Sequence, residues 1–180
     1  MKTDFDLMQT NLIEPSRNVP STQQNGTIHG TILIVEDEEN DAFFLQTALQ
    51  KAGLRNPVYL VENGRLALDY LSGAGEFANR KMYPLPSVVF LDLKLPQVNG
   101  LAILKWIREQ PFLPSMTVVI LTSSSLDEDI DRAYRLGANS YVVKPSSRDK
   151  LVEIINDFGN WWFKHNAPPP TRIQLPVAAA

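Results

Sequence analysis

The chain has 180 residues, of which 44% are hydrophobic and 21% are charged, a composition typical of one globular domain with some residues to spare. Its formal net charge of −3 argues against nucleic acid as a ligand, because neutralising several phosphates requires a basic surface. The lack of cysteine excludes disulfides, thiolate metal sites and cysteine nucleophiles in this chain, and no apolar run reaches the ~20 residues that span a bilayer. We therefore expect a cytoplasmic protein that binds neither nucleic acid nor a membrane.

Both ends of the chain have compositions that cannot bury a core. Residues 1–27 mix acidic residues with prolines and lack the basic start and apolar stretch of a signal peptide, so we predict a flexible N-terminal arm. Residues 166–180 contain Pro168-Pro169-Pro170 and end in alanines, and we predict a flexible tail there. The folded domain is then expected at residues 28–165.

Short apolar runs alternate with segments of helical periodicity between these ends, and the alternation repeats five times. The first run, Thr31 to Val35, is continuous rather than alternating, which is typical of a strand buried on both faces. The other expected strands are residues 58–61, 87–91, 117–121 and 141–143. This order predicts an α/β fold, a doubly wound five-stranded parallel sheet with helices on both faces.

Capping signals predict where the helices begin. The expected helices start near Asn40, Asn63, Asn99, Ser125 and Ser146. The segments 125–128 and 146–149 match the capping box, in which a serine at the helix start accepts a bond from the N–H three residues later. Residues 72–86 are predicted to form a long loop.

Polar residues follow four of the five expected strands at their carboxyl ends. They are Glu36 and Asp37, Asp92, Thr122 and Ser123, and Lys144. Ligands of doubly wound sheets bind at this edge, where three carboxylates would repel one another and raise at least one pKa unless a cation lay among them. Oxygen ligands without cysteine or suitably spaced histidine favour Mg²⁺.

This combination of residues is suited to phosphoryl transfer. An aspartate such as Asp92 can attack phosphorus if the charge on the phosphoryl oxygens is neutralised, and Mg²⁺ and Lys144 would supply the counter-charges. Thr122 adds a hydroxyl, and the small Ser123 leaves room for the phosphate. A lone acidic residue after a strand is usually a helix cap or turn former, but capping does not require all of these residues at the same end of successive strands.

The order and spacing of these motifs resemble the receiver domains of two-component response regulators over about residues 30 to 160. The matching segments are Glu36-Asp37, Leu91 to Pro96 with Asn99-Gly100, Thr122-Ser123, and Tyr141 to Pro145. The resemblance implies a flavodoxin-like strand order of 2-1-3-4-5. It also implies a protein that receives its phosphoryl group from a sensor histidine kinase. Its expected output is contact with another protein or phosphotransfer onward.

The same resemblance assigns roles to individual residues. Asp92 is expected to be the phosphoacceptor, with Thr122 and Lys144 as the other catalytic residues. Mg²⁺ is expected to be held by Glu36, Asp37, Asp92 and the backbone carbonyl of Lys94. Thr122 and Tyr141 are expected to form the switch that repacks the surface after phosphorylation. The Lys144–Pro145 peptide is expected to be cis.

Two further features concern partners and the lifetime of the phosphorylated state. The loop at residues 72–86 and the Leu95-Pro96 pair are similar to small regulators that partner cyanobacterial and bacterial phytochromes. Glu36 replaces the more usual aspartate of the family, and Lys94 and Ser124 occupy positions whose side chains tune the lifetime of the acyl phosphate. The dephosphorylation rate therefore does not follow from the resemblance.

Three other functions remain as alternatives. A haloacid-dehalogenase-type phosphatase also uses an aspartate nucleophile, but its second aspartate, two residues later, is replaced here by Lys94. A flavin- or nucleotide-binding module of this topology would need a glycine-rich loop after the first strand, where Glu36-Asp37 would repel phosphate. A transcription factor would need a DNA-binding domain, and we expect too few residues after the last helix for one.

Two surfaces are predicted to contact other proteins. Phe43 projects from the side of the first helix opposite its apolar face, so it is expected to be exposed and is a candidate anchor for the kinase. The last helix has more apolar residues than one face can bury, with Val152, Trp161 and Phe163 outside its main stripe. We therefore predict a homodimer through the fourth helix, fifth strand and fifth helix, strengthened by phosphorylation.

Overall fold

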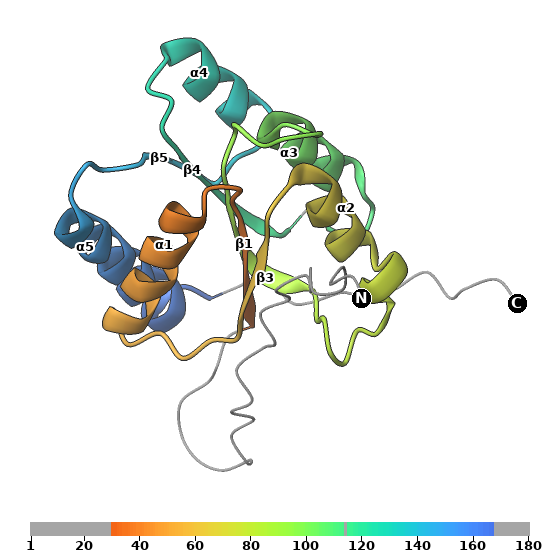
Figure 1. The fold of residues 1–180 in the computed structure, drawn as a ribbon, viewed down its shortest axis with the longest axis horizontal. Coiled ribbons are helices and arrows are strands. Elements are labelled where there is room, and N and C mark those ends of the chain that lie inside the picture. Colours follow the sequence, from red (N-terminus) through yellow and green to blue (C-terminus); the bar gives the residue numbers. More distant parts are fainter. Residues whose placement is uncertain (1–29, 114, 168–180) are drawn as a thin grey trace, which may run out of the picture.

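A computed structural model describes residues 30–113 and 115–167 of the chain (Figure 1). The predicted arm at residues 1–27 lies outside the described residues, as does the predicted tail from residue 168 onwards. Within the described part, no helix is long and apolar enough to cross a membrane.

The core of the fold is one parallel sheet of five strands in the order β2-β1-β3-β4-β5, which confirms the predicted fold class. Its strands are β1 (Thr31–Val35), β2 (Val58–Val61), β3 (Pro86–Leu91), β4 (Thr117–Thr122) and β5 (Ser140–Val143). The helices are α1 (Glu39–Lys51), α2 (Gly64–Ser72), α3 (Gly100–Glu109), α4 (Asp127–Arg135) and α5 (Arg148–Gly159). Helices α1 and α5 cover one face of the sheet, and α2, α3 and α4 lie on the other side (Figure 1).

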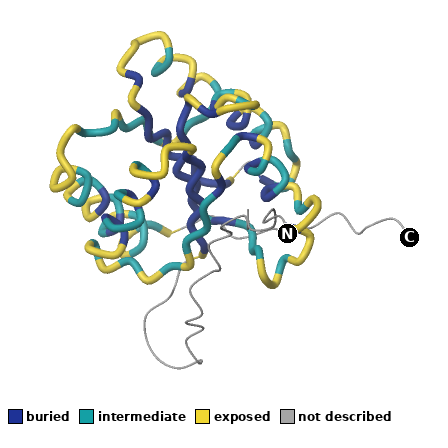
Figure 2. Tube along the Cα trace, viewed as in Figure 1, coloured by how far each residue is buried: buried dark blue, intermediate teal, exposed yellow. Residues whose placement is uncertain are grey.

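Two apolar clusters, one on each face, hold the helices to the sheet. The buried residues lie at the centre of the domain in Figure 2. Successive side chains of a strand point to opposite faces, so Leu33 belongs to the cluster under α2 and α3 while Ile34 packs with α1 and α5. Both side chains are almost fully buried. Burial on both sides explains why the central strands read as continuous apolar runs.

The long connection before β3 is partly ordered by short structure of its own. It contains a 3-10 helix, η1 (Gly75–Ala78). A separate π-helical turn, η2 (Asn160–His165), extends α5 near the end of the described residues. Phe77 of η1 is buried against Tyr70 and Tyr83, with ring centroids 5.2 and 5.1 Å away. The predicted loop at residues 72–86 is therefore closed by aromatic packing.

Two of the five predicted helix starts, Asn63 and Asn99, are confirmed as helix caps. The side chain of Asn63 accepts a bond from the Leu66 N–H, and that of Asn99 accepts one from the Ala102 N–H, both over 2.9 Å. These bonds satisfy N–H groups that have no partner inside the helix. Asn99 also marks the place where the chain leaves the edge of the sheet and enters α3.

The two predicted capping boxes are wrong in detail. Helix α4 begins after Leu126 without a side-chain cap, and the hydroxyl of Ser124 instead donates to the Asp129 carboxylate over 2.6 Å. Helix α5 is capped by Ser147, one residue after the predicted Ser146. Consecutive serines share the same local pattern, so the sequence does not decide which of them caps the helix.

Candidate functional site

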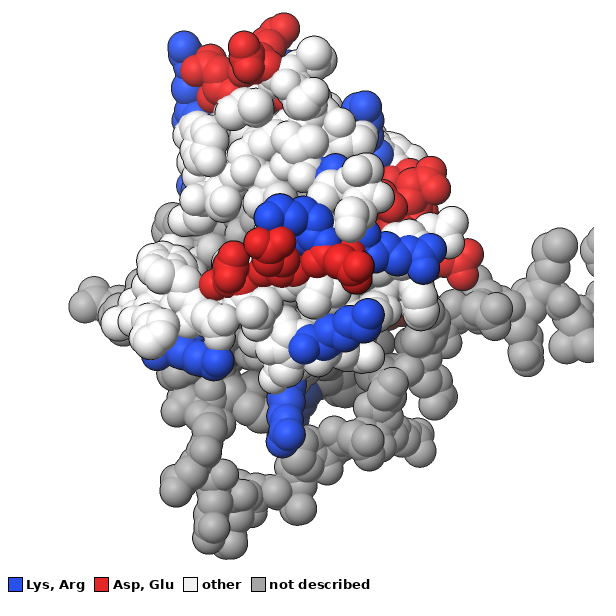
Figure 3. All heavy atoms as spheres, turned by 90° about the vertical axis from the view of Figure 1, so that its left-hand side faces the viewer, with Lys and Arg blue, Asp and Glu red and all other residues white. Residues whose placement is uncertain are grey.

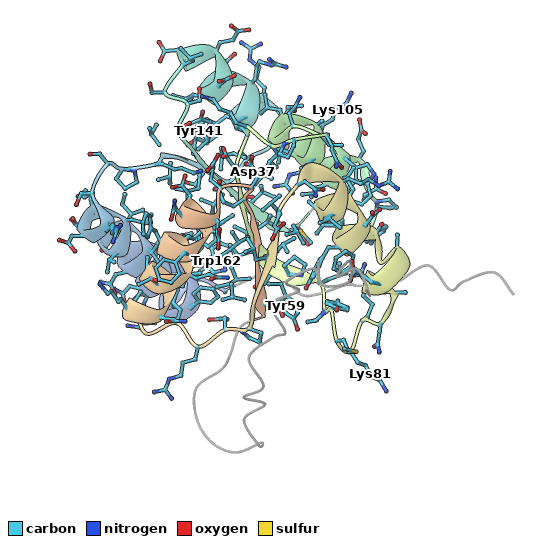
Figure 4. The ribbon with its side chains drawn as sticks, viewed as in Figure 1. Asp37, Tyr59, Lys81, Lys105, Tyr141 and Trp162 are labelled. Atoms are coloured by element: carbon cyan, nitrogen blue, oxygen red, sulfur yellow. The ribbon has the colours of Figure 1, made fainter. Side chains whose placement is uncertain are left out.

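The carboxyl ends of β1, β3, β4 and β5 meet at one edge of the sheet, and the predicted site residues follow these ends directly. Backbone bonds continue the pairing beyond the strands: the Glu36 N–H donates to the Val61 carbonyl over 3.1 Å, and the Asp92 N–H donates to the Val35 carbonyl over 3.0 Å. Asp37 and Tyr141 lie at this edge in Figure 4. The sheet itself therefore fixes where the acidic side chains begin.

Three carboxylates gather at the edge and form what we call the acidic pocket, Glu36, Asp37 and Asp92. Each places one oxygen within 4.8 Å of the other two. Glu36 and Asp92 are only 4% and 5% exposed, whereas Asp37 faces solvent. An ion could therefore enter from the side of Asp37 and meet two buried carboxylates.

The Asp92 carboxylate is held in one orientation by the turn that follows β3. Its Oδ1 accepts hydrogen bonds from the N–H groups of Leu93, over 2.6 Å, and Lys94, over 3.2 Å. Its Oδ2 lies 3.1 Å from the Nζ of Lys144. One oxygen is thus fixed by the backbone while the other faces a cation.

Lys144 is the cation of the pocket and has three acidic partners. Its Nζ lies 2.7 Å from Glu36 Oε2, 2.8 Å from Asp41 Oδ2 and 3.1 Å from Asp92 Oδ2. Burial by itself would lower the pKa of Lys144, but the hydrogen bonds to Asp41 and Glu36 outweigh it and raise the pKa above its ordinary value. Lys144 therefore keeps its positive charge although its side chain is only 15% exposed.

The carboxyl of Glu36 binds its proton more tightly in the pocket than in water. Its burial raises its pKa from 4.5 to about 7, and the charge of Asp92 adds to this, while Lys144 opposes it. The expected rise of one pKa is confirmed, but burial contributes more than the repulsion between carboxylates. A divalent cation would favour the ionised carboxylates, so the donor set fits a hard metal ion such as Mg²⁺.

Thr122 and Tyr141 are joined through one residue of the β4–α4 connection. Thr122 is fully buried, and its hydroxyl oxygen accepts a long bond, 3.5 Å, from the Ser124 N–H. The Tyr141 hydroxyl donates to the Ser124 carbonyl over 3.1 Å. Any movement of Thr122 that displaces Ser124 would therefore also act on Tyr141.

These features recur in a known family. A family model for the response regulator receiver domain matches residues 32–156, which is more than half of the chain and includes the whole acidic pocket, Lys144, Thr122 and Tyr141. The chain belongs to this family. It is a response regulator and acts in phosphorelay signalling, which confirms that prediction over the phosphatase and flavin-binding alternatives.

Relatives and solved structures agree with this assignment. The chain is 35% identical over 141 residues to the probable methanogenesis regulatory protein FilR2 of Methanothrix harundinacea (strain 6Ac), covering 77% of this chain and 86% of that protein. It is similar to the crystal structure of the phosphorylated cyanobacterial phytochrome response regulator RcpA, with a TM-score of 0.73 and 32% identity over 78% of this chain and 99% of the other.

A third similar protein is the response regulator Rcp1 of Synechocystis sp. (strain ATCC 27184 / PCC 6803 / Kazusa), which is 29% identical over 74% of this chain and 88% of its own. The crystal structure of its Mn²⁺-bound form has a TM-score of 0.71 to this chain and 28% identity, over 78% of this chain and 99% of that one. The receiver fold and the recognised resemblance to phytochrome response regulators are thus both confirmed.

The receiver structure brings the predicted side chains together and adds one that the sequence reasoning missed. Asp41, in the first turn of α1, contacts Lys144. Asp37 precedes the helix, so helical spacing does not relate the two residues, and no sequence signal singled Asp41 out. The side chain of Lys94 is exposed, and its backbone N–H belongs to the Asp92 turn.

One implied feature of the receiver is wrong. The described residues contain no cis peptide bond, so Lys144–Pro145 is trans. The two isomers of a bond before proline differ by only about 0.5–1 kcal/mol in free energy, which is why the local sequence does not decide between them.

Acidic and basic side chains interleave on the face shown in Figure 3. The acidic atoms at the top of that view lie where Figure 1 places α4, whose first turn carries Asp127, Glu128 and Asp129. Negative charge at the start of a helix is stabilised by the helix dipole, so we assign these residues no chemistry.

Proposed function

We propose that Asp92 is the phosphoacceptor of this receiver domain and that its carboxylate attacks the phosphorus of a phosphohistidine on a sensor kinase. A P–O bond to Asp92 forms while the P–N bond breaks, and the imidazole leaves with the bonding electron pair. The observation that carries this proposal is the orientation of the buried Asp92 carboxylate by two backbone N–H groups, with its other oxygen 3.1 Å from an ammonium group. The domain would catalyse its own phosphorylation and dephosphorylation.

Lys144 and Thr122 are proposed to stabilise the transferred group. The Lys144 ammonium, which now bonds to carboxylates, would donate to a phosphoryl oxygen as a compact positive charge. The Thr122 hydroxyl is held only by a 3.5 Å contact, so it can turn to donate to the same group. Both side chains are largely shielded from water, which strengthens their interaction with the phosphoryl charge.

Mg²⁺ is the proposed cofactor, held by the three carboxylates of the acidic pocket and the backbone carbonyl of Lys94. When bound, the ion would neutralise charge on the phosphoryl oxygens. The all-oxygen donors support a hard divalent cation, and so does the Mn²⁺ in the Rcp1 structure.

Phosphorylation is proposed to act through Ser124. If Thr122 moves onto the phosphoryl group, the Ser124 backbone moves with it and the Tyr141 hydroxyl loses its present acceptor. The Tyr141 ring would then take another position on the surface formed by α4, β5 and α5. This gives the output surface two states, which a partner can distinguish by differential affinity.

The proposed partners are a sensor histidine kinase of the phytochrome class and a second copy of the chain. The similarity to RcpA supports the first, and Phe43 of α1, which is 61% exposed, offers an apolar anchor for the kinase. Exposed Leu126, Tyr134 and Val143 support a homodimer through α4, β5 and α5. A cytoplasmic location is part of the same proposal.

A small phosphodonor tests the assignment of Asp92. We expect acetyl phosphate to add one phosphoryl group in the presence of Mg²⁺ and none after chelation, as measured by intact-protein mass spectrometry. Asp92→Asn should abolish the reaction, because an amide does not attack phosphorus, whereas Asp157→Asn on the exposed side of α5 should react like the wild type. Equal labelling of both variants would refute the proposal.

A further inference from the structure

Asp41 is a member of the site for which the proposed reaction has no use. It lies in the first turn of α1, and its Oδ2 is 2.8 Å from the Lys144 Nζ. Its side chain is 41% exposed, and it is outside the group of carboxylates that could hold a metal ion. Asp41 therefore contacts the cation of the pocket without belonging to the proposed ligands of Mg²⁺.

The three partners of Lys144 differ in what a divalent cation would do to them. An ammonium group has three N–H donors, and here Glu36, Asp92 and Asp41 lie within bonding distance of it. Glu36 and Asp92 are also the two buried members of the acidic pocket. A cation bound by them would compete with Lys144 for their charge and would repel its ammonium group.

Space next to Lys144 would allow the ammonium group to leave. A hollow of about 310 Å³ between α1 and the β5–α5 connection is lined by Lys144, Asp41 and Ser146, among others. The other cation of the hollow, Arg148, lies 3.9 Å over the ring of Phe44 and is not among the ion pairs of the described residues. Asp41 thus stands on the outer side of Lys144 with its negative charge directed to that residue.

We propose that Asp41 is a positioning residue that keeps the Lys144 ammonium group at the acidic pocket when Glu36 and Asp92 turn to a divalent cation. Asp41 supplies the counter-charge that those two carboxylates then withdraw, and this lowers the repulsion between Lys144 and the ion. The ammonium group stays within reach of an incoming phosphoryl group. This inference rests on the proposed metal site and adds a residue to it that binds neither the ion nor the phosphoryl group.

The test is the affinity for Mg²⁺ alone, measured by isothermal titration calorimetry without a phosphodonor. We expect Asp41→Asn to weaken Mg²⁺ binding by about two- to fivefold, the size appropriate to a partly exposed ion pair. Glu39→Gln is the matched control, because Glu39 is an exposed acidic residue in the same turn and is in no ion pair of the described residues. Asp41→Glu, which keeps the charge, should recover most of the affinity.

Each outcome decides one question. A wild type that binds no Mg²⁺ would refute the proposed metal site itself. If the wild type binds Mg²⁺ but Asp41→Asn weakens binding no more than Glu39→Gln, the positioning role is refuted and the metal site stands. Circular dichroism of both variants establishes that they are folded. A loss confined to Asp41→Asn and reversed in Asp41→Glu supports the proposal, because a purely structural role in the first turn would affect both positions.

Discussion

Gly100 packs directly against the backbone of Asp92. A Cβ atom at Gly100 would lie 2.1 Å from the Asp92 carbonyl oxygen and 2.9 Å from the Cα of Leu93. The Gly100 N–H also donates to the Leu93 carbonyl over 3.0 Å. The start of α3 is thus packed directly on the turn that orients the acceptor carboxylate.

Gly100→Ala should therefore damage both stability and phosphorylation. We expect the free energy of unfolding to fall by about 1–3 kcal/mol, because the new methyl group meets backbone that cannot give way. Gly53→Ala is the control, because Gly53 has a positive φ of 72° but no atom lies within 4 Å of the new Cβ. Its free energy of unfolding should fall by about 1 kcal/mol, from the strained backbone angle alone. Urea denaturation gives both values, and unchanged phosphorylation by acetyl phosphate in Gly100→Ala would contradict the positioning role.

Individual site residues were predictable to the extent that they follow a strand. Glu36 and Asp92 directly follow buried strands and Thr122 ends one, so strand direction alone brings them to one edge. Asp41 lies on a helix, and its contact with Lys144 depends on how α1 packs beside the β5–α5 connection. No local pattern encodes that packing.

The β4–α4 connection is the element on which the proposed switch depends. The carbonyl of its Ser124 accepts a hydrogen bond from the Tyr141 hydroxyl over 3.1 Å. The Ser124 hydroxyl donates to the Asp129 carboxylate in the first turn of α4 over 2.6 Å. The sequence predicted a helix here but assigned its cap to Ser125, because three adjacent serines look alike before the fold is known. The correct bond shows that Ser124 ties β5 and α4 to the same loop.

Tyr141→Phe should uncouple that loop from β5. We expect a loss of about 1 kcal/mol in the free energy of unfolding, the usual value for one hydrogen bond, and normal labelling of Asp92. The chemical-shift changes of α4 amides after addition of beryllofluoride, a phosphoryl mimic, should be reduced. Tyr134→Phe is the comparison variant. The Tyr134 hydroxyl of α4 accepts a hydrogen bond from the Tyr141 N–H of β5 over 3.2 Å, so this variant removes a different bond to the same strand. Full α4 shift changes in Tyr141→Phe would exclude the proposed coupling.

The aromatic packing around α2 makes a pH-dependent prediction. Burial raises the pKa of Tyr70 above its ordinary value of 10.0, and the Tyr70 hydroxyl donates to the Pro84 carbonyl over 2.9 Å. Below the unfolded pKa both states keep the proton; as the pH rises through it, the unfolded chain releases the proton first, so stability falls with rising pH.

The wild type should lose stability above about pH 10 by up to about 1.4 kcal/mol per pH unit from this group. Tyr70→Phe should be less stable than the wild type by about 1 kcal/mol near pH 8, where the hydrogen bond is intact. The difference should shrink or reverse near about pH 11. Urea denaturation at both pH values measures it, and a constant difference would show that Tyr70 does not titrate in this way.

The fold of the whole domain was the most predictable property. Buried strands and amphipathic helices alternate along the chain, and right-handed crossovers leave few arrangements for such an order. The surface is less predictable, because it depends on which apolar residues remain uncovered. Val152 and Phe163, expected outside the buried stripe of α5, pack against the cluster under α1, whereas Trp161 is 59% exposed.

Trp161 and the exposed residues of α4 and β5 give the homodimer prediction its test. We expect sedimentation velocity to show dimers of the wild type, in larger proportion with beryllofluoride, and mostly monomers of Trp161→Glu. Lys164→Glu, an exposed position in the same π-helical turn, is the control. A wild type that stays monomeric in both states at all accessible concentrations would contradict the dimer.

The central claim is that Asp92 carries the phosphoryl group, and chemical trapping tests it most directly. Borohydride reduces the acyl phosphate of an aspartate to homoserine, so peptide mapping by mass spectrometry identifies the modified position. After reaction with acetyl phosphate and Mg²⁺, we predict homoserine at position 92 of the wild type and at no position of Asp92→Asn. Homoserine at another aspartate in the wild type, with Asp92 unmodified, would contradict the account.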